Sequence, residues 1–326
     1  MRFLKSEAGA VVLWGLFTIL LAAAITPWLF AWGKDFAAVY HGHGGIFGWL
    51  AGSCERARIS RYFNRSMLIA AVLLLIPLVW RIRRIGHAND GKHQPTPWAR
   101  IGWQAGVCHA IAGFTAAAGL LWLLGIAVEA GGAFTPSENE TSTKTFILRA
   151  VAPALGASIL EEWIFRAILI GLWLRVCGAW MACLGTSLVF AFVHFLEPPR
   201  GAEIADSRAW SAGFELLGLV LRSYLNPQFI AAEFLTLFTV GMALAWARLR
   251  TGSLWLPIGM HAGWVFAFKS FNMFHQPAEQ NSLGSLFVGD SLRVGILPLA
   301  TLAITWLLVA WLLRWIPRGR FDGLRS

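Results

Sequence analysis

Three charged side chains, Glu161, Glu162 and Arg166, lie close together inside the otherwise apolar run 146–174. A charged group at the centre of a membrane helix costs roughly 2.5–3.5 kcal/mol on insertion scales, so it needs a partner and is usually functional. Glu162 and Arg166 are one helical turn apart on the same face, which predicts an ion pair. Glu161 points about 100° away and is the carboxylate left for chemistry. Two carboxylates that only line a water-filled crevice are the alternative.

Two histidines lie in other apolar runs. His194 ends the run after the acidic motif, with Phe190 one turn before it, and His261 lies in a later run. A lone membrane histidine is often only a hydrogen-bonding residue between helices. One glutamate and two histidines on separate runs, however, are suited to activating water by general-base catalysis. We expect Glu161, His194 and His261 to converge within about 10 Å on one water-accessible cavity.

Apolar helices must position these groups. The chain is 57% hydrophobic and only 13% charged, whereas soluble domains are about 25% charged. We therefore predict an all-α polytopic membrane protein with about eight transmembrane helices. The expected spans are 8–32, 63–80, 102–130, 146–175, 178–196, 229–249, 254–272 and 294–316.

Loop charges predict the topology. Basic residues are concentrated in 81–100 and 314–325, whereas the loop 131–145 is more acidic. Positive loops stay in the cytoplasm, so both termini are expected there. The segment Arg56–Arg65 contains four arginines on the side assigned to the outside. Either it belongs to an interfacial helix, or the first hairpin is drawn differently. The net charge of +10 includes no long basic run interleaved with aromatic residues, so we expect no nucleic-acid partner.

The motifs resemble a known family in their order and spacing. Glu-Glu-x-x-x-Arg at 161–166, Phe-x-x-x-His at 190–194 and a later helix with His261 are similar to the CAAX protease and bacteriocin-processing (CPBP) family. That family of intramembrane endopeptidases includes the Ras-converting CAAX protease. The resemblance covers about 145–270.

The resemblance implies a division of the chain and a location. The division has N-terminal helices at 1–144, a catalytic core at 145–272, and a final helix with a basic tail at 273–326. We expect an integral protein of a bacterial inner membrane that meets a peptide or protein substrate within or at the bilayer.

The resemblance also implies roles. Glu161 would be the general base, His194 would share its water, and His261 would stabilise the oxyanion. Glu162 and Arg166 would position Glu161, and Phe190 would help to orient the site.

One position departs from the family pattern. Four residues after the histidine the family commonly has Asn, a second oxyanion donor, whereas this chain has Val265. Loss of one such donor can lower the rate by 10²–10³. The indole N–H of Trp264 and the amide of Asn272 are candidate substitutes.

Other mechanisms and functions remain open. The chain lacks the His-Glu-x-x-His motif of zinc peptidases and the Gly-x-Ser-x-Gly motif of serine hydrolases. A metal-free glutamate mechanism without cofactor is therefore favoured, with zinc as the alternative because Glu and His can bind it. A non-catalytic peptide-binding or bacteriocin-immunity protein is a second function, and a proton-coupled transporter is a third.

Overall fold

The computed structural model describes residues 7–87, 102–137, 141–196, 198–199, 202–223 and 227–315. It is helical nearly throughout, so the all-α prediction is confirmed. The strands in the described part are β1 (Phe134–Pro136) and β2 (His275–Pro277), which pair antiparallel with Phe134 opposite Pro277.

Packing divides the chain into two compact units. The first combines Met1–Lys92 with Val193–Gln228, and the second combines His93–Phe192 with Phe229–Ser326. Packing therefore groups residues 193–228 with the N-terminal helices, whereas the predicted division into 1–144, 145–272 and 273–326 follows the motifs.

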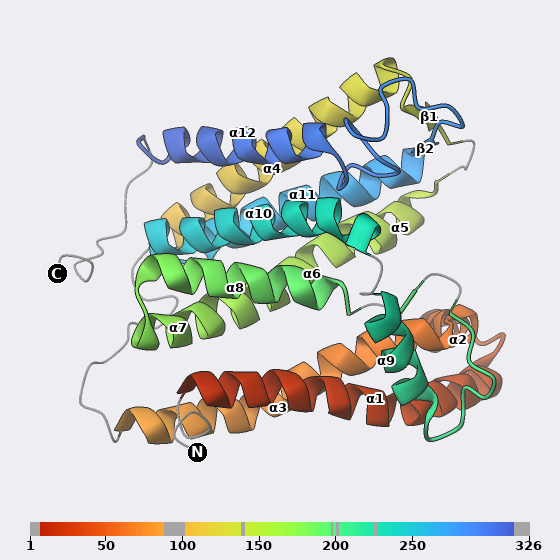
Figure 1. Ribbon diagram of the computed structural model, residues 1–326. Coiled ribbons are helices and arrows are strands. Elements are labelled where there is room, and N and C mark those ends of the chain that lie inside the picture. Colours follow the sequence, from red (N-terminus) through yellow and green to blue (C-terminus); the bar gives the residue numbers. More distant parts are fainter. Residues whose placement is uncertain are drawn as a thin grey trace. The chain divides into compact units, whose positions relative to one another are not determined.

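The first unit is a long helical hairpin with two short helices. α1 and α3 pack along each other, α2 connects them, and α9 packs against α1, where Gly213 meets the backbone carbonyl of Ala23 (Figure 1). Their bounds are α1 Glu7–Tyr40, α2 Gly45–Arg56, α3 Ile59–His87 and α9 Ala212–Ser223.

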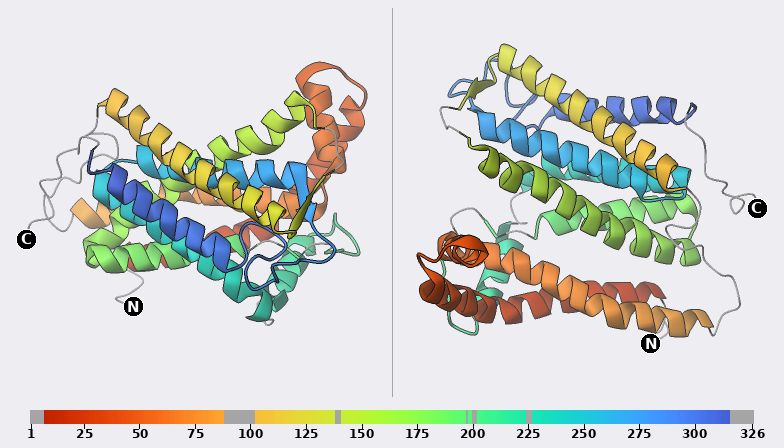
Figure 2. Two further views of the ribbon diagram at one scale, coloured as in Figure 1. Left: turned by 90° about the horizontal axis from the view of Figure 1, so that it is seen from above. Right: turned by 180° about the vertical axis from the view of Figure 1, so that it is seen from behind.

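The second unit contains the acidic motif and His261. α4 packs against both α11 and α12 (Figures 1 and 2), and α11 also packs against α6. The bounds are α4 Trp103–Ala130, α5 Thr143–Phe146, α6 Ala152–Glu162, α7 Ile170–Val176, α8 Ala179–His194, α10 Pro227–Thr251, α11 Trp255–Phe274 and α12 Ile296–Leu312.

The acidic motif lies on one continuous helical stretch that contains two π-helical turns. Ser142 caps its start, where the hydroxyl accepts a hydrogen bond from the Thr145 backbone N–H at 3.3 Å. π-helical turns follow at Ile147–Val151 and at Trp163–Leu169. The first precedes Pro153, which lacks an N–H. The second begins directly after Glu162, and such wide turns are frequent at functional sites.

Small residues let α11 approach α4 closely. A Cβ on Gly259 would meet the backbone carbonyl of Ala110, and one on Gly263 would lie 2.6 Å from the carbonyl oxygen of Phe114. Gly259 and Gly263 share a helix face, and His261 lies about 200° around the helix from Gly259. Close packing on the α4 side therefore turns His261 toward the opposite side of α11.

The membrane prediction is supported in its coarser form. The protein is an integral membrane protein, and all eight predicted apolar runs fall on helices. Three helices are long and apolar enough to cross a bilayer within the described residues: Gly9–Tyr40, Ile59–Arg81 and Trp103–Ala130. α8 and α12 are shorter apolar helices. The basic segments 88–101 and 316–326, on which much of the topology prediction depends, lie outside the described residues.

Candidate active site

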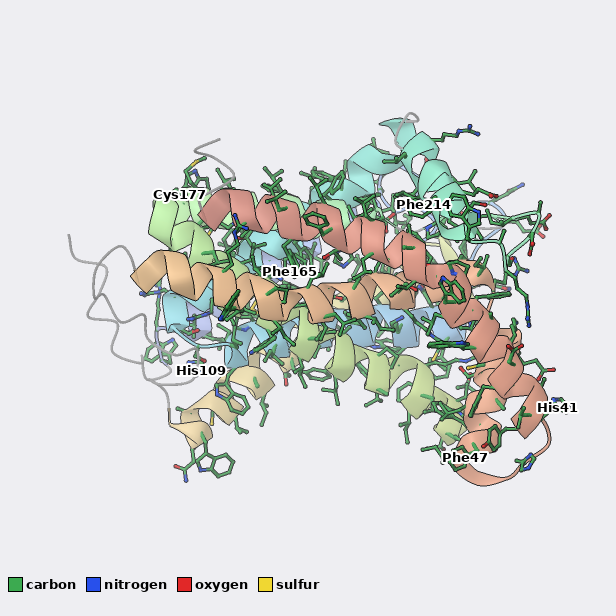
Figure 3. All side chains as sticks on the ribbon, turned by 90° about the horizontal axis from the view of Figure 1, so that it is seen from below. His41, Phe47, His109, Phe165, Cys177 and Phe214 are labelled. Atoms are coloured by element: carbon green, nitrogen blue, oxygen red, sulfur yellow. The ribbon has the colours of Figure 1, made fainter. Side chains whose placement is uncertain are left out.

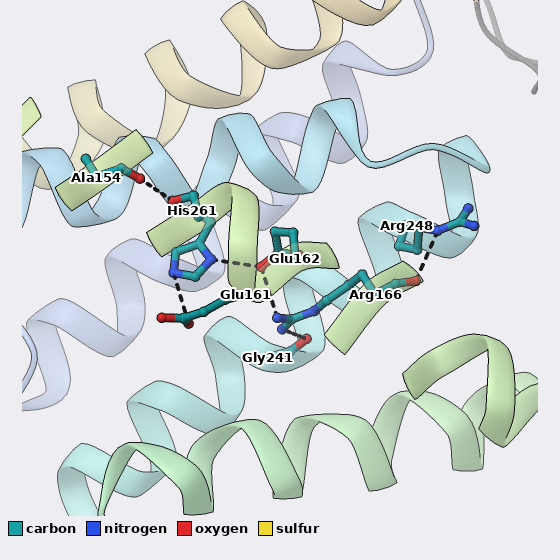
Figure 4. A network of polar contacts seen from close by, with 8 residues as sticks. Ala154, Glu161, Glu162, Arg166, Gly241, Arg248 and His261 are labelled. Carbon is teal, nitrogen blue, oxygen red and sulfur yellow. Dashed lines mark hydrogen bonds and ion pairs between the residues drawn. The ribbon is translucent and has the colours of Figure 1, made fainter. Parts of the chain in front are cut away.

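Glu162 is a fully buried carboxylate with two cationic or polar partners. Its Oε1 accepts a hydrogen bond from Nη1 of Arg166 at 3.0 Å, and the same oxygen lies 2.8 Å from Nδ1 of His261 (Figure 4). The pair with Arg166 has the i, i+4 spacing that predicted it. A carboxylate that already accepts from a guanidinium is an acceptor toward the histidine too, so Nδ1 of His261 is the donor.

Arg166 is also fully buried and is anchored from several helices. Its Nη2 donates to the backbone carbonyl of Gly241 on α10 at 3.2 Å. Its guanidinium carbon lies 4.4 Å from the ring centroid of Phe190 on α8. Arg248 Nε in turn donates to the Arg166 carbonyl at 3.3 Å. These contacts fix the cation that neutralises Glu162.

Glu161 has the more exposed side chain of the two glutamates, although its Oε2 is buried. Its side chain is 27% exposed, whereas that of Glu162 is 0% exposed. The Glu161 Oε2 lies 3.8 Å from Nε2 of His261, which is too far for a direct hydrogen bond. His261 therefore stands between the two glutamates, with one ring nitrogen bonded to Glu162 and the other facing Glu161 (Figure 4).

Phe190 packs beside this network as well as beneath Arg166. Its ring meets the imidazole of His261 edge-on with centroids 5.9 Å apart, and it also meets Phe165 edge-on at 5.2 Å. Edge-to-face contacts of this kind are favourable for aromatic rings beyond the area that they bury. The geometry gives Phe190 a contact with both a cation and the imidazole, and its orienting role stays a prediction.

The contact between Glu162 and His261 was not predicted from the sequence. The two residues are 99 positions apart, and helical spacing relates only residues on one helix. The available signal was weaker: both are ionisable groups inside apolar runs, and each needs a partner. Sequence reasoning gave Glu162 a single partner, Arg166, whereas the carboxylate has two.

The remaining predicted residues are spread along α8 and α11. His194 is the last residue of α8 and is partly buried; it belongs to the first unit, so its place beside Glu161 stays a prediction. Val265 is one turn after His261 and is partly buried. Trp264 is buried in the apolar core formed with α4 and α12, and its indole N–H has no hydrogen-bond partner among the described residues. Asn272 is exposed and about 16 Å farther along the helix axis from His261.

The donor set fits a metal poorly. A catalytic zinc site takes three protein ligands. In this network Nδ1 of His261 is bound to Oε1 of Glu162, which leaves Nε2 of His261, the Glu161 carboxylate and Oε2 of Glu162 as donors, and the Glu162 carboxylate is already held by Arg166. No group of three His, Cys, Asp or Glu side chains suitable for a metal occurs among the residues that the structure describes.

Comparison with known proteins identifies the region that contains the network. Residues 143–267 match the Rce1-like family, described as Type II CAAX prenyl endopeptidase Rce1-like. The matched segment runs from α5 into α11 and includes both glutamates, both histidines and Val265. No curated protein and no solved structure matches the chain. The resemblance predicted from the motifs is confirmed for this segment: residues 143–267 are similar to the Rce1-like CAAX endopeptidase family.

Proposed function

We propose that the protein is an intramembrane endopeptidase of the CAAX type, in which Glu161 activates the water that attacks a peptide bond. The observation that carries this proposal is the difference between the adjacent glutamates. Glu162 is fully buried and bonded to Arg166 and His261, whereas Glu161 is 27% exposed and faces Nε2 of His261 at 3.8 Å. Only Glu161 combines access to water with a neighbouring histidine.

The reaction needs one proton acceptor and one donor to the oxyanion. Glu161 takes a proton from water while the water oxygen bonds to the scissile carbonyl carbon, and the carbonyl oxygen becomes an oxyanion. Collapse of this intermediate breaks the carbon–nitrogen bond, and Glu161 returns the proton to the leaving amine. His194 holds the same water in this proposal.

His261 is the proposed oxyanion donor, and its contact with Glu162 decides which ring nitrogen is left to face the oxyanion. With Nδ1–H donated to Glu162, a neutral ring has only a lone pair at Nε2, so only the imidazolium can donate from that nitrogen. Glu162 orients the imidazole so that Nε2 faces Glu161.

Val265 favours one competing function. Valine cannot donate to an oxyanion, and a site with one donor fewer can be a peptide-binding site that no longer cleaves. Trp264 is the nearer of the two candidate substitutes to His261, but its ring is part of the apolar core. A non-catalytic peptide-binding or immunity role therefore stands as the second candidate.

A cleavage assay separates the two functions. The purified protein in detergent would be incubated with fluorogenic peptides that carry a cysteine near the C-terminus, with and without a prenyl group. We expect cleavage by the wild type and a loss of about 10²–10⁴-fold in Glu161→Gln, the range of general-base catalysis. Glu279→Gln, at an exposed loop position, is the matched control and should be fully active.

Two results would contradict the mechanism. Cleavage that survives Glu161→Gln would remove this residue from the chemistry, and inhibition by a chelator that zinc reverses would favour the metal alternative. Binding of the peptides without cleavage by any preparation would support the immunity-type function.

We propose further that the protein crosses a bacterial inner membrane eight times, with both termini in the cytoplasm. All eight apolar runs fall on helices, although only three of these helices satisfy length and composition together. Reporter fusions after residues 90 and 326 should both give a cytoplasmic signal. A periplasmic signal from either fusion would overturn this topology.

A further inference from the structure

The short helix α2 is too short to cross a bilayer. Its 12 residues extend about 18 Å, against a hydrocarbon thickness of roughly 30 Å. It nevertheless exposes large apolar side chains: Ile46 is 67% exposed, Phe47 53% and Trp49 43%. Figure 3 shows Phe47 and His41 together at the turn between α1 and α2. A short helix with an exposed apolar surface, between two long apolar helices, has the character of a segment lying in the membrane interface.

The junction between α2 and α3 is held by side chains from both long helices. Lys34 on α1 donates from Nζ to the backbone carbonyls of Glu55 at 2.6 Å and Ala57 at 3.0 Å. The hydroxyl of Tyr62 on α3 donates to the carbonyl of Cys54 at 3.1 Å. These carbonyls end a helix and have no partner within it. The elbow from Cys54 to Tyr62 is therefore a fixed structure.

Four arginines lie within this elbow or just after it. Arg61 and Arg65 are one turn apart on one face of α3, and Arg58 directly precedes that helix. Arg56 is the last residue of α2, and all four side chains are exposed. We call this set the arginine elbow. It places positive charge at the C-terminal end of α2, whose exposed apolar side chains lie nearer its N-terminal end.

In the part of the chain that the structure describes, no acidic side chain forms an ion pair with the arginine elbow. The nearby acidic groups are already engaged, since Glu55 lies 3.3 Å from His41 and Asp35 lies 2.7 Å from Arg208. Within the described residues, none of the four arginines is within ion-pair distance of an acidic side chain. Arg65 lies over the ring of Tyr62 at 5.7 Å, which is a contact but supplies no negative charge. A group of exposed guanidinium ions without acidic partners on the described chain favours an anionic partner from outside.

We propose that the arginine elbow binds the phosphate groups of anionic phospholipids at the membrane surface, while the apolar side chains of α2 enter the outer acyl region. Guanidinium groups pair readily with phosphate oxygens, and each basic residue near an anionic bilayer contributes about a fivefold gain in affinity. A lipid partner also explains why a basic segment occurs where the predicted topology has an outside loop. The inference does not depend on the proposed peptidase function.

The test compares lipids on the full-length protein in neutral detergent. Native mass spectrometry would give the affinity for the first bound phosphatidylglycerol and phosphatidylcholine. We expect the wild type to prefer phosphatidylglycerol at least about tenfold, and the triple variant Arg58→Gln, Arg61→Gln, Arg65→Gln to lower that preference to about twofold or less. The matched control carries the same charge change at exposed, dispersed positions: Arg149→Gln, Arg250→Gln and Arg314→Gln. It should keep most of the preference.

Further measurements keep the test valid if a variant misfolds, and they distinguish a lipid site from a site that binds phosphate alone. If the glutamine variant does not fold, the corresponding lysine variant should keep the preference, and 1 M salt should remove it from the wild type because salt screens exposed charges. Glycerol phosphate should not displace the lipid, because it lacks the acyl chains that contact α2. An equal affinity for both lipids, an equal loss in the control variant, or full displacement by glycerol phosphate would each overturn the proposal.

Discussion

The two units contain arginines in opposite surroundings, one buried among internal partners and the others exposed. Arg166 in the second unit is fully buried, and Glu162, Gly241 and Phe190 all contact its guanidinium. Arg58, Arg61 and Arg65 in the first unit are exposed and have no acidic partner among the described residues. The energetic consequences differ, since a buried charge depends on its internal partners, whereas an exposed one is solvated or pairs with an external ion. The comparison teaches that burial and partners, more than residue type, indicate whether a membrane-protein arginine maintains the fold or meets a ligand.

The strongest test of this difference between buried and exposed arginines is to remove the side chain of Arg166. Arg166→Ala leaves Glu162 as a buried carboxylate with His261 as its remaining partner, and loss of one member of a buried pair typically costs about 3–5 kcal/mol. We expect a large fall in the thermal midpoint in detergent and in expression. Arg61→Ala is the matched control, and surface changes of this kind usually stay within about 0.5 kcal/mol.

Arg166→Lys refines the same measurement. Lysine keeps the positive charge but cannot reach two acceptors with a planar fork, so the contact with the Gly241 carbonyl would be lost. We expect a stability between those of the wild type and the alanine variant. If Arg166→Ala and Arg61→Ala melt at similar temperatures, the distinction between a structural and a ligand-facing arginine is wrong.

A smaller effect is expected where α11 is pressed against α4. Gly259→Ala adds a methyl group that would meet the Ala110 backbone carbonyl, so the helices must separate, and overpacking of this kind costs about 1–3 kcal/mol. Because His261 lies across the same helix, its 2.8 Å contact with Glu162 should also suffer. We expect lower stability together with a lower cleavage rate, measured by thermal unfolding and peptide hydrolysis.

Gly119→Ala on α4 is the matched control for that substitution. No atom lies within 4 Å of the position its Cβ would take, and alanine favours a helix over glycine. We expect unchanged or slightly higher stability and full activity. Equal behaviour of the two variants would show that the close approach of α11 to α4 does not position His261.

The sequence predicted the helical fold well, for a physical reason. A membrane-spanning helix satisfies its own backbone hydrogen bonds, so hydropathy alone locates it. The ends were less predictable: α1 continues to Tyr40, past the apolar run predicted to end at 32, because Lys34 and the residues around it lower the hydropathy without breaking the helix. The wide turn at Trp163–Leu169 was not predicted either, since it leaves no mark in composition.

The site was predictable only within single helices. The i, i+4 spacing gave the ion pair between Glu162 and Arg166, and it separated Glu161 from that pair. Helical spacing could not predict His261, the second partner of Glu162, because the two residues lie on different helices. Which helices are neighbours depends on packing, such as the contact of Gly259 with α4. The position of His194 beside Glu161 stays a prediction for the same reason.

The smallest expected effect is also the most informative about activity. Val265 is partly buried one turn after His261, where the family commonly has an oxyanion donor. If the protein cleaves peptides, Val265→Asn should restore a second donor near Nε2 of His261, and the rate should rise or at least not fall, provided the amide fits where Val265 packs. If the site has lost its catalytic activity, neither the wild type nor Val265→Asn should cleave. Robust wild-type cleavage that survives His261→Ala would count most heavily against the assignment. In that case the imidazole between the two glutamates would only stabilise Glu162, and the oxyanion role would have to be assigned elsewhere.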